Sequence, residues 1–345
     1  MRILYLFNGK KGAHLDSILK GEMPDDHLYG MMRLRRLGIE TDYIEPEQIY
    51  SATASRLIRK MCTVYFQHLA LFWKFFSYDV VFAPNAYGSE LFFSLFGRPK
   101  WVVYDFSISG LIGNRRMFRQ KVFYWMIGRS SGIITLSLYE ELLLKKMFPE
   151  LSSKIFFIPF GTDTSFFKPD STVPEERQIF VPGFDPCRDY KTLVSAIGDN
   201  PVKIVMTKST TSLNFETASP NIELKTMNWK ELAHEYLKSQ IVVITLDIKN
   251  GINEASGCST LVQAMAMGKA IIVTSTPTTE SYIEDGRNGI LVPMHDIVAL
   301  RSAIEKLLAD KELRNSLGRQ ARIFAQRHCS SDQTSKKLAL FFKGI

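Results

Sequence analysis

The stretch SGCSTLVQAMAMGKAII, residues 256–272, holds a turn of small residues, then a helical pattern, then an apolar strand. A helix that follows such a turn leaves backbone N–H groups unpaired at its positive end, which suits a phosphate or diphosphate. An ordinary core helix capped by Ser or Thr would have the same composition. The candidate anion contacts in this turn are Ser256, Gly257, Ser259 and Thr260.

Apolar runs alternate with helical patterns on both sides of this stretch. The expected strands are 2–7, 40–44, 79–83, 100–104, 132–136, 155–158, 178–182, 202–206, 222–225, 241–245, 270–274 and 290–292. The expected helices are 26–37, 55–76, 88–96, 115–128, 138–147, 189–197, 229–238, 259–267, 279–284 and 296–309. This alternation indicates an α/β fold with two doubly wound, parallel, Rossmann-like sheets.

The chain of 345 residues is long enough for two domains. A polar, proline-containing segment without periodicity, 171–177, is the expected linker. It divides a domain at 1–170 from one at 178–328, and a terminal helix at 329–345 is expected to pack back on the first domain. Ligands of doubly wound sheets bind at the carboxyl ends of the strands, so we expect the two domains to face a cleft.

Composition restricts the compartment and the class of protein. A hydrophobic fraction of 46% and a charged fraction of 23% are those of an ordinary folded protein. Residues 2–7 already have the pattern of a buried strand, so we expect no signal peptide and a cytoplasmic location. The four cysteines are far apart in the sequence and have neither metal-ligand nor disulfide spacing. We therefore expect no metal and no cofactor.

Positive charge is concentrated in one window. Residues 51–130 hold eleven Lys or Arg and three Asp or Glu, an excess equal to the chain's whole net charge of +8. Two basic segments in this window, 56–76 and 114–129, are rich in aromatics, which is typical of helices lying on an anionic membrane surface. The alternative is that the aromatics are core and the cations are solvated. No nucleic-acid-binding motif accompanies the charge, so nucleic acid is not an expected partner.

Four strings, in this order and spacing, resemble those of GT-B glycosyltransferases of the retaining family-4 type, also called glycosyl transferases group 1. They are IPFGTDTSFFKP at 158–169, FVPGFDPCRDYKTL at 180–193, LVQAMAMGKAII at 261–272 and YIEDGRNGILV at 282–292. The resemblance implies that the C-terminal domain binds a nucleotide-diphosphate sugar and the N-terminal domain presents the acceptor.

Departure of a sugar from a nucleoside diphosphate builds negative charge on the leaving phosphate, so cations there stabilise the transition state. The resemblance places basic residues in the loop after the first donor-domain strand. Arg188 is the leading candidate because its planar guanidinium matches phosphate oxygens, with Lys191 and Lys208 as second choices. Gly183 would let the backbone approach the donor. The alternatives are a plain surface charge at Arg188 and a simple turn at Gly183.

The chain departs from the family pattern in one pair of carboxylates. Family members commonly carry two glutamates separated by seven residues, but here Gln263 stands at the second position and Ala255 at the first. Glu254 is one place away from that first position and would fill it if the alignment has a gap. Gln263 retains the ability to donate and accept hydrogen bonds, without a charge.

The N-terminal domain offers weaker candidates. Many family members have a His after the strand that corresponds to 100–104, where this chain has Asp105. Asp105 could orient an acceptor hydroxyl or take its proton, or it could cap the following turn. Asp25 and His27 lie in a region that borders the acceptor in the family, although capping a helix start would explain Asp25 equally well.

The sequence therefore predicts a hexosyltransferase that moves a hexose from a UDP- or GDP-linked sugar to a lipid-linked or polysaccharide acceptor. Retention of configuration and independence of metals come from the resemblance, and peripheral attachment to the inner face of the cell membrane comes from the two basic segments. The alternatives are a non-catalytic GT-B subunit that binds a nucleotide, an inverting transferase, and a nucleotide-sugar epimerase.

Overall fold

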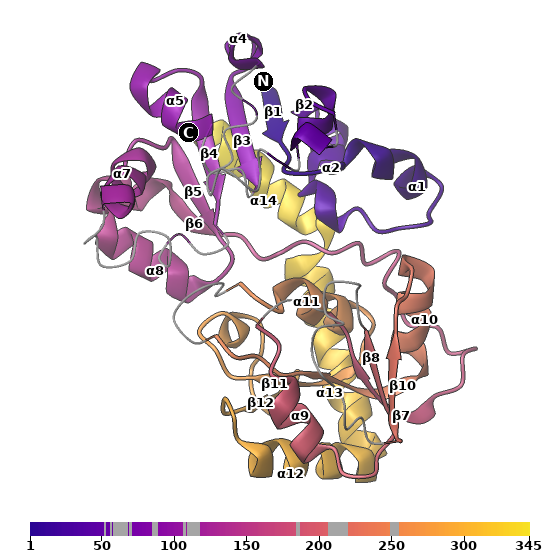
Figure 1. The fold of residues 1–345 in the computed structure, drawn as a ribbon. Coiled ribbons are helices and arrows are strands. Elements are labelled where there is room, and N and C mark those ends of the chain that lie inside the picture. The colour runs from indigo at the N-terminus through magenta and orange to yellow at the C-terminus, as the bar shows by residue number, and fades with distance from the viewer. Residues whose placement is uncertain are drawn as a thin grey trace. The chain divides into compact units, whose positions relative to one another are not determined.

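The computed structural model describes residues 1–51, 53–55, 57, 68, 71–84, 89–105, 108, 118–183, 187–205, 220–248 and 255–345. The chain forms two compact units, each built around one six-stranded sheet (Figure 1). The first unit consists of Met1–Lys20, Asp25–Pro159 and Thr334–Ile345. The second consists of Gly21–Pro24 and Phe160–Gln333.

The sheet of the first unit is entirely parallel, with strand order β2-β1-β3-β4-β5-β6. Its strands are β1 (Arg2–Leu6), β2 (Glu40–Ile44), β3 (Val80–Pro84), β4 (Lys100–Tyr104), β5 (Gly132–Thr135) and β6 (Ile155–Phe157). Each expected strand of this half is present within two residues of its predicted limits. The direction of winding reverses between β1 and β3, which is where ligands of such sheets bind.

The described helices of the first unit are mostly short. They are α1 (Leu15–Leu19), α2 (Met31–Arg36), α4 (Phe72–Phe75), α5 (Ser89–Phe96), α7 (Phe118–Ile127) and α8 (Leu138–Met147). The continuous helix expected at 26–37 is wrong: a 3₁₀ turn, Asp26–Leu28, precedes α2. Tyr29 and Gly30 between them have φ of 48° and 79°, a left-handed conformation that interrupts a right-handed helix. Most of the helix expected at 55–76 lies outside the described residues.

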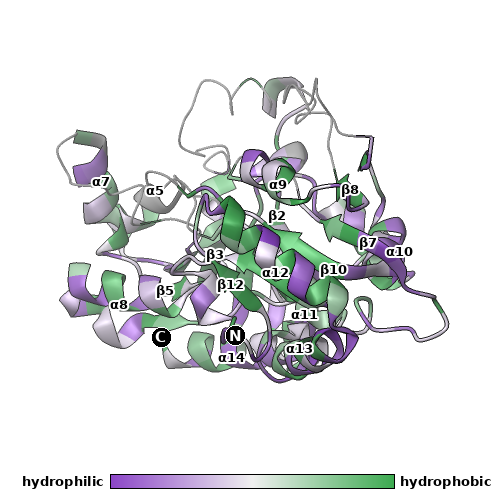
Figure 2. Ribbon diagram, turned by 90° about the horizontal axis from the view of Figure 1, so that it is seen from below, coloured by the Kyte–Doolittle hydropathy of each residue, from purple (hydrophilic) through white to green (hydrophobic). Residues whose placement is uncertain are grey.

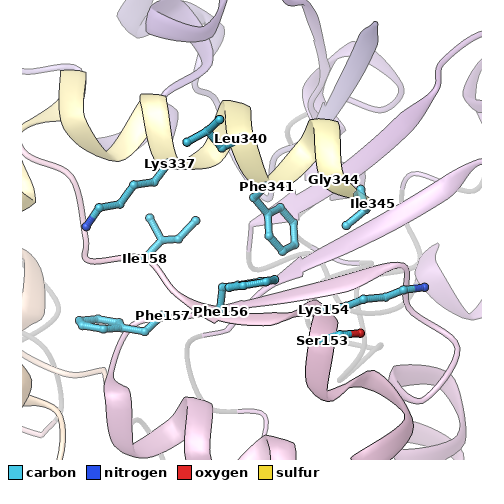
Figure 3. Close-up of a pocket in the computed structure, with 10 residues that line it drawn as sticks. All are labelled: Ser153, Lys154, Phe156, Phe157, Ile158, Lys337, Leu340, Phe341, Gly344 and Ile345. Carbon is cyan, nitrogen blue, oxygen red and sulfur yellow. The ribbon is translucent and has the colours of Figure 1, made fainter.

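The last helix of the chain, α14 (Ser331–Gly344), contributes to the core of the first unit. The ring of Phe342 packs edge-on against Phe82 of β3, with centroids 5.3 Å apart, and Phe341 packs against Phe156 of β6. Lys100 Nζ donates to the backbone carbonyl of Ile345 at 2.8 Å. A pocket of about 340 Å³ lies between α14 and β6, with mostly apolar walls (Figure 3).

The second sheet is also parallel, with strand order β12-β11-β10-β7-β8-β9. Its strands are β7 (Glu176–Val181), β8 (Val202–Val205), β9 (Ile222–Lys225), β10 (Ser239–Ile244), β11 (Ala270–Thr274) and β12 (Ile290–Val292). Winding reverses between β7 and β10, which are hydrogen-bonded neighbours. The apolar strands appear green in Figure 2, whereas helices such as α12 alternate apolar and polar positions. This pattern explains why the strands form the buried layer.

The described α-helices of the second unit are α9 (Tyr190–Ala196), α10 (Trp229–Lys238), α11 (Cys258–Ala266), α12 (Ile297–Ala309) and α13 (Lys311–Phe324). All of these described helices except α11 begin at a side-chain cap. Asn228 and Glu231 form a capping box at α10, and Asp296 and Asp310 cap α12 and α13. The expected helix at 279–284 is reduced to a 3₁₀ turn, Thr279–Ser281.

A close approach of backbone to backbone joins α11 and α13. A Cβ atom at Gly318 of α13 would collide with the carbonyl oxygen of Gly268, which follows α11, so only glycine fits there. Arg322, one turn further along α13, donates to the carbonyls of Thr164, Phe167 and Ala266. These contacts fix the C-terminal end of α11, so its N-terminal end is presented by a rigid element.

Candidate functional site

The carboxyl ends of the central strands of the second sheet are tied together by backbone hydrogen bonds. Arg188, in the loop after β7, forms an antiparallel bridge with Leu246, which follows β10. On either side of this bridge the N–H of Asp189 donates to Thr245 O at 3.1 Å and the N–H of Asp247 donates to Cys187 O at 2.7 Å. The switch point of this sheet therefore carries an ordered loop.

Arg188 is directed by this loop to the start of α11. Its side chain is buried, and its Nη2 donates to the Oγ1 of Thr260 at 2.8 Å. The same hydroxyl donates to the carbonyl of Gly257 at 2.9 Å. Because both functions of the hydroxyl are used, Thr260 holds the guanidinium in one position at the N-terminal turn of the helix.

The N-terminus of α11 is not capped by a side chain. Gly257, with φ of 77°, stands at the N-cap position, and no cap hydrogen bond from a side chain is made there within the described part of the chain. Among the described residues, the backbone N–H groups of Ser259 and Thr260 have no hydrogen-bond acceptor. The helix therefore has the donors and the positive dipole end that an anion binds. A Ser/Thr-capped helix, the alternative left open by the sequence, is not what forms.

Gly183 makes room for Arg188 at the end of β7. Gly183 has φ of 87°, and a Cβ atom there would collide with the Arg188 guanidinium and lie 2.9 Å from Thr260 Cγ2. The hydroxyl of Tyr190 donates to the Gly183 carbonyl at 3.1 Å. The space above this glycine is thus occupied by the Arg188 side chain.

The other predicted donor contacts differ in their burial and in whether the structure describes them. Ser256 is buried in the turn before α11, and Gln263 is buried in the helix three residues after Thr260. Lys191 is exposed on the first turn of α9. Lys208 and Glu254 lie outside the described residues. The structure therefore brings together Gly183, Arg188, Ser256, Gly257, Ser259 and Thr260.

Lys269 of the opening stretch has a structural role. Its Nζ donates to Glu175 and to the carbonyls of Leu237 and Ser239 at 2.9–3.1 Å. Burial lowers the pKa of Lys269, although the nearby Glu175 opposes this effect. The lysine therefore fastens α10 and β10 to the start of β7.

Sequence reasoning missed a histidine beside the Arg188 loop. His295, between β12 and α12, places its Nδ1 2.8 Å from Asp189 Oδ2 and its Nε2 3.6 Å from Asp247 Oδ1. The contact with Asp189 spans 106 positions, so no local pattern announces it.

Asp105 of the first unit is held by the turn after β4. The residue is buried, and its Oδ1 accepts from the N–H of Ile108 at 2.6 Å. This is the turn-capping contact that the sequence left open as an alternative to an acceptor role.

The two remaining predicted residues, Asp25 and His27, lie in the segment between β1 and α2. Asp25 is buried and accepts from Arg33 Nε at 2.6 Å, and it makes no cap hydrogen bond to the 3₁₀ turn that follows. Burial, and then the charges of Lys11 and His14, lower the pKa of His27 to about 3, so His27 is neutral at neutral pH. A neutral imidazole has one donor and one acceptor nitrogen for a sugar hydroxyl.

Comparison with known proteins identifies the architecture. Residues 217–324 match the family described as "Glycosyl transferases group 1", whereas no curated protein matches the chain. Among solved structures, Anabaena HepE in complex with UDP-glucose aligns over 100% of both chains, with a TM-score of 0.72 and 13% identity. Sucrose-phosphate synthase from Thermosynechococcus elongatus aligns over 100% of this chain and 98% of its own, with a TM-score of 0.71 and 16% identity.

A third structure, a glycosyltransferase from Rickettsia africae, aligns over 99% of this chain and 98% of its own, with a TM-score of 0.71 and 16% identity. The family match within the second unit and the fold along the whole chain together support a glycosyltransferase of the GT-B type. The predicted fold class and enzyme class are confirmed.

Proposed function

We propose that this glycosyltransferase takes a hexosyl group from a nucleoside-diphosphate sugar, and that the diphosphate binds at Arg188 and the start of α11. The observation that carries the proposal is the buried guanidinium of Arg188, held 2.8 Å from Thr260 Oγ1 beside uncapped N–H groups. HepE, which has the same fold, was solved with UDP and with UDP-glucose.

The chemistry of this site follows from charge. As the bond from the sugar to the diphosphate breaks, negative charge grows on the leaving oxygen. A fixed guanidinium and aligned N–H groups stabilise that charge without needing to reorganise, and they do so more strongly in the transition state than in the ground state. We propose that Arg188 supplies the positive charge without a metal, and that the new glycosidic bond retains the configuration.

The remaining donor contacts belong to the same proposal. Lys191 is exposed on the first turn of α9 and is proposed to contact the diphosphate, and Lys208 and Glu254 are proposed to complete the donor site. Gln263 is proposed to hydrogen-bond a hydroxyl of the ribose or of the sugar, without contributing a charge.

The first unit is proposed to bind the acceptor. Asp105 at the end of β4 would orient an acceptor hydroxyl, and Asp25 and His27 would border it near the end of β1. The neutral state of His27 is compatible with hydrogen bonding to a saccharide.

A lipid-linked acceptor and a peripheral membrane position are supported by exposed apolar side chains in the first unit. Phe118 is 82% exposed at the start of α7, and Trp73 is 58% exposed on α4. Phe72, Phe76, Leu95 and Phe96 are also exposed, and the cations Lys74 and Arg98 lie among them in the sequence. Aromatic and cationic side chains together favour an anionic lipid surface. None of the described helices is long and apolar enough to cross a membrane.

Purified protein incubated with UDP- and GDP-sugars tests the proposed activity. We expect saturable binding of one nucleotide sugar and slow hydrolysis of that donor in the absence of an acceptor. Binding without hydrolysis or transfer would favour the non-catalytic subunit, and no binding of any nucleotide sugar would refute the donor site. Flotation with vesicles of anionic lipid at low salt tests the membrane position, which fails if the protein does not float.

A further inference from the structure

Three loops at the carboxyl edge of the second sheet meet at one imidazole. His295 comes from the loop between β12 and α12, Asp189 from the loop after β7, and Asp247 from the segment after β10. The Nδ1 of His295 lies 2.8 Å from Asp189 Oδ2, and its Nε2 lies 3.6 Å from Asp247 Oδ1. Each ring nitrogen therefore faces a different carboxylate.

His295 holds this place in a strained backbone conformation. Its φ is 61°, in the left-handed region that is unfavourable for an L-residue. A glycine or an asparagine would adopt this conformation more easily. The imidazole makes contacts with two carboxylates there, which a glycine could not make.

Asp189 links His295 to the loop that carries Arg188. Its Oδ1 accepts from the N–H of Thr192 at 3.0 Å and so caps α9, while its Oδ2 binds His295. The neighbouring residue is Arg188, whose guanidinium reaches Thr260. A shift of Asp189 would therefore move the start of α9 and Arg188 together.

We infer that His295 is a positioning residue for Arg188, because it joins the loop after β7 to the segment after β10 through Asp189 and Asp247. The inference rests on the proposed diphosphate role of Arg188. His295 thus fixes the proposed cation of the donor site from a third loop, through Asp189.

The charge state of the imidazole determines how many loops it joins. A protonated imidazole has an N–H on both ring nitrogens and can donate to both carboxylates, whereas a neutral one can donate to only one. A replacement side chain that keeps only one donor should therefore keep only part of the bridge.

Hydrogen exchange measures the bridge without any ligand. The amides of Asp189 and Asp247 donate across the two joined segments, so their protection reports how firmly the segments are held. In His295→Gly, whose backbone is comfortable at this φ, we expect protection of both amides to fall by about 10-fold, as for the loss of one charge-assisted hydrogen bond. His295→Asn keeps one donor, so protection of the two amides should be intermediate in this variant.

A second histidine of the same unit provides the matched control. His234 is exposed on α10, and His234→Asn makes the same chemical change away from the loop. Its exchange at Asp189 and Asp247 should match that of the unmodified protein. Equal protection of these amides in His295→Gly and in the unmodified protein would overturn the inference.

UDP binding separates this inference from the proposed function. Arg188→Ala should abolish most of the UDP binding that depends on the cation, whereas His295→Gly, which keeps Arg188 but loosens it, should weaken UDP binding by about 10-fold. If exchange changes in His295→Gly while Arg188→Ala binds UDP normally, the bridge stands and the diphosphate role fails. If UDP binding depends on Arg188 but is the same in His295→Gly, positioning by His295 is wrong.

Discussion

The two sheets differ in what they carry at their carboxyl edges. In the second unit, the loop after β7 presents a cation, Arg188, which a hydroxyl holds at a helix N-terminus. In the first unit, the turn after β4 presents a carboxylate, Asp105, which accepts from a backbone N–H of its own turn. Two similar parallel sheets thus end in loops of opposite charge at these positions, a buried cation in one and a buried carboxylate in the other.

Replacing Arg188 should change nucleotide binding more than any other substitution considered below. Arg188→Ala should weaken binding of UDP or GDP by about 1.5–3 kcal/mol, the range for hydrogen bonds to charged groups. Arg188→Lys should recover only part of the loss, because an ammonium cannot match two phosphate oxygens at once. Isothermal titration calorimetry measures the nucleotide affinity of both variants. Asp105→Asn, after β4 of the other sheet, is the control. If its nucleotide affinity falls as far as that of Arg188→Ala, the contrast between the two sheets is wrong.

Gly183→Ala should have the next largest effect. The new Cβ would be strained at φ of 87° by about 1–2 kcal/mol and would displace the Arg188 guanidinium. We expect a lower midpoint of thermal unfolding and weaker nucleotide binding together. Gly198→Ala, at φ of 57° but with nothing within 4 Å of its Cβ position, is the matched control. It should lower stability while leaving affinity unchanged, and an equal loss of affinity would count against a specific role for Gly183.

Thr260→Val and Thr260→Ser test whether the Thr260 hydroxyl holds Arg188 in place. Valine removes the hydroxyl that accepts from Arg188 and donates to Gly257, so nucleotide affinity should fall by about 1 kcal/mol. Serine keeps the hydroxyl and should retain most of the affinity. The hydroxyl has no part in binding if both variants bind nucleotide as the unmodified protein does.

A smaller effect should appear in the pH dependence of stability. Burial raises the pKa of the Asp189 carboxyl, but hydrogen bonds from Thr192 and His295 outweigh burial and bring it below its ordinary value. A carboxyl with a lowered folded-state pKa stabilises the protein above its unfolded pKa of about 3.9, and this stability is lost as pH falls further. Asp189→Asn still caps α9 but should unfold with a weaker dependence on pH between 5 and 3. Thermal unfolding curves measure the difference, and an unchanged dependence would contradict it.

Local patterns predicted the strands well because buried parallel strands are short apolar runs between polar turns. The helix expected at 26–37 failed because its break depends on tertiary packing: a Cβ at Gly30 would lie 2.8 Å from Ser335 Oγ, more than 300 positions away. In the candidate site, Arg188 and the turn before α11 were visible in the sequence. Their joining through Thr260, and the bridge at His295, connect distant segments and could not be predicted without an alignment.

Soaking crystals of the protein with a mixture of UDP- and GDP-sugars would show where the diphosphate binds. We expect electron density for one nucleotide sugar, with diphosphate oxygens within hydrogen-bond distance of the Arg188 guanidinium and of the N–H groups of Ser259 and Thr260. A nucleotide bound with its diphosphate away from Arg188 and from the start of α11 would contradict this expectation.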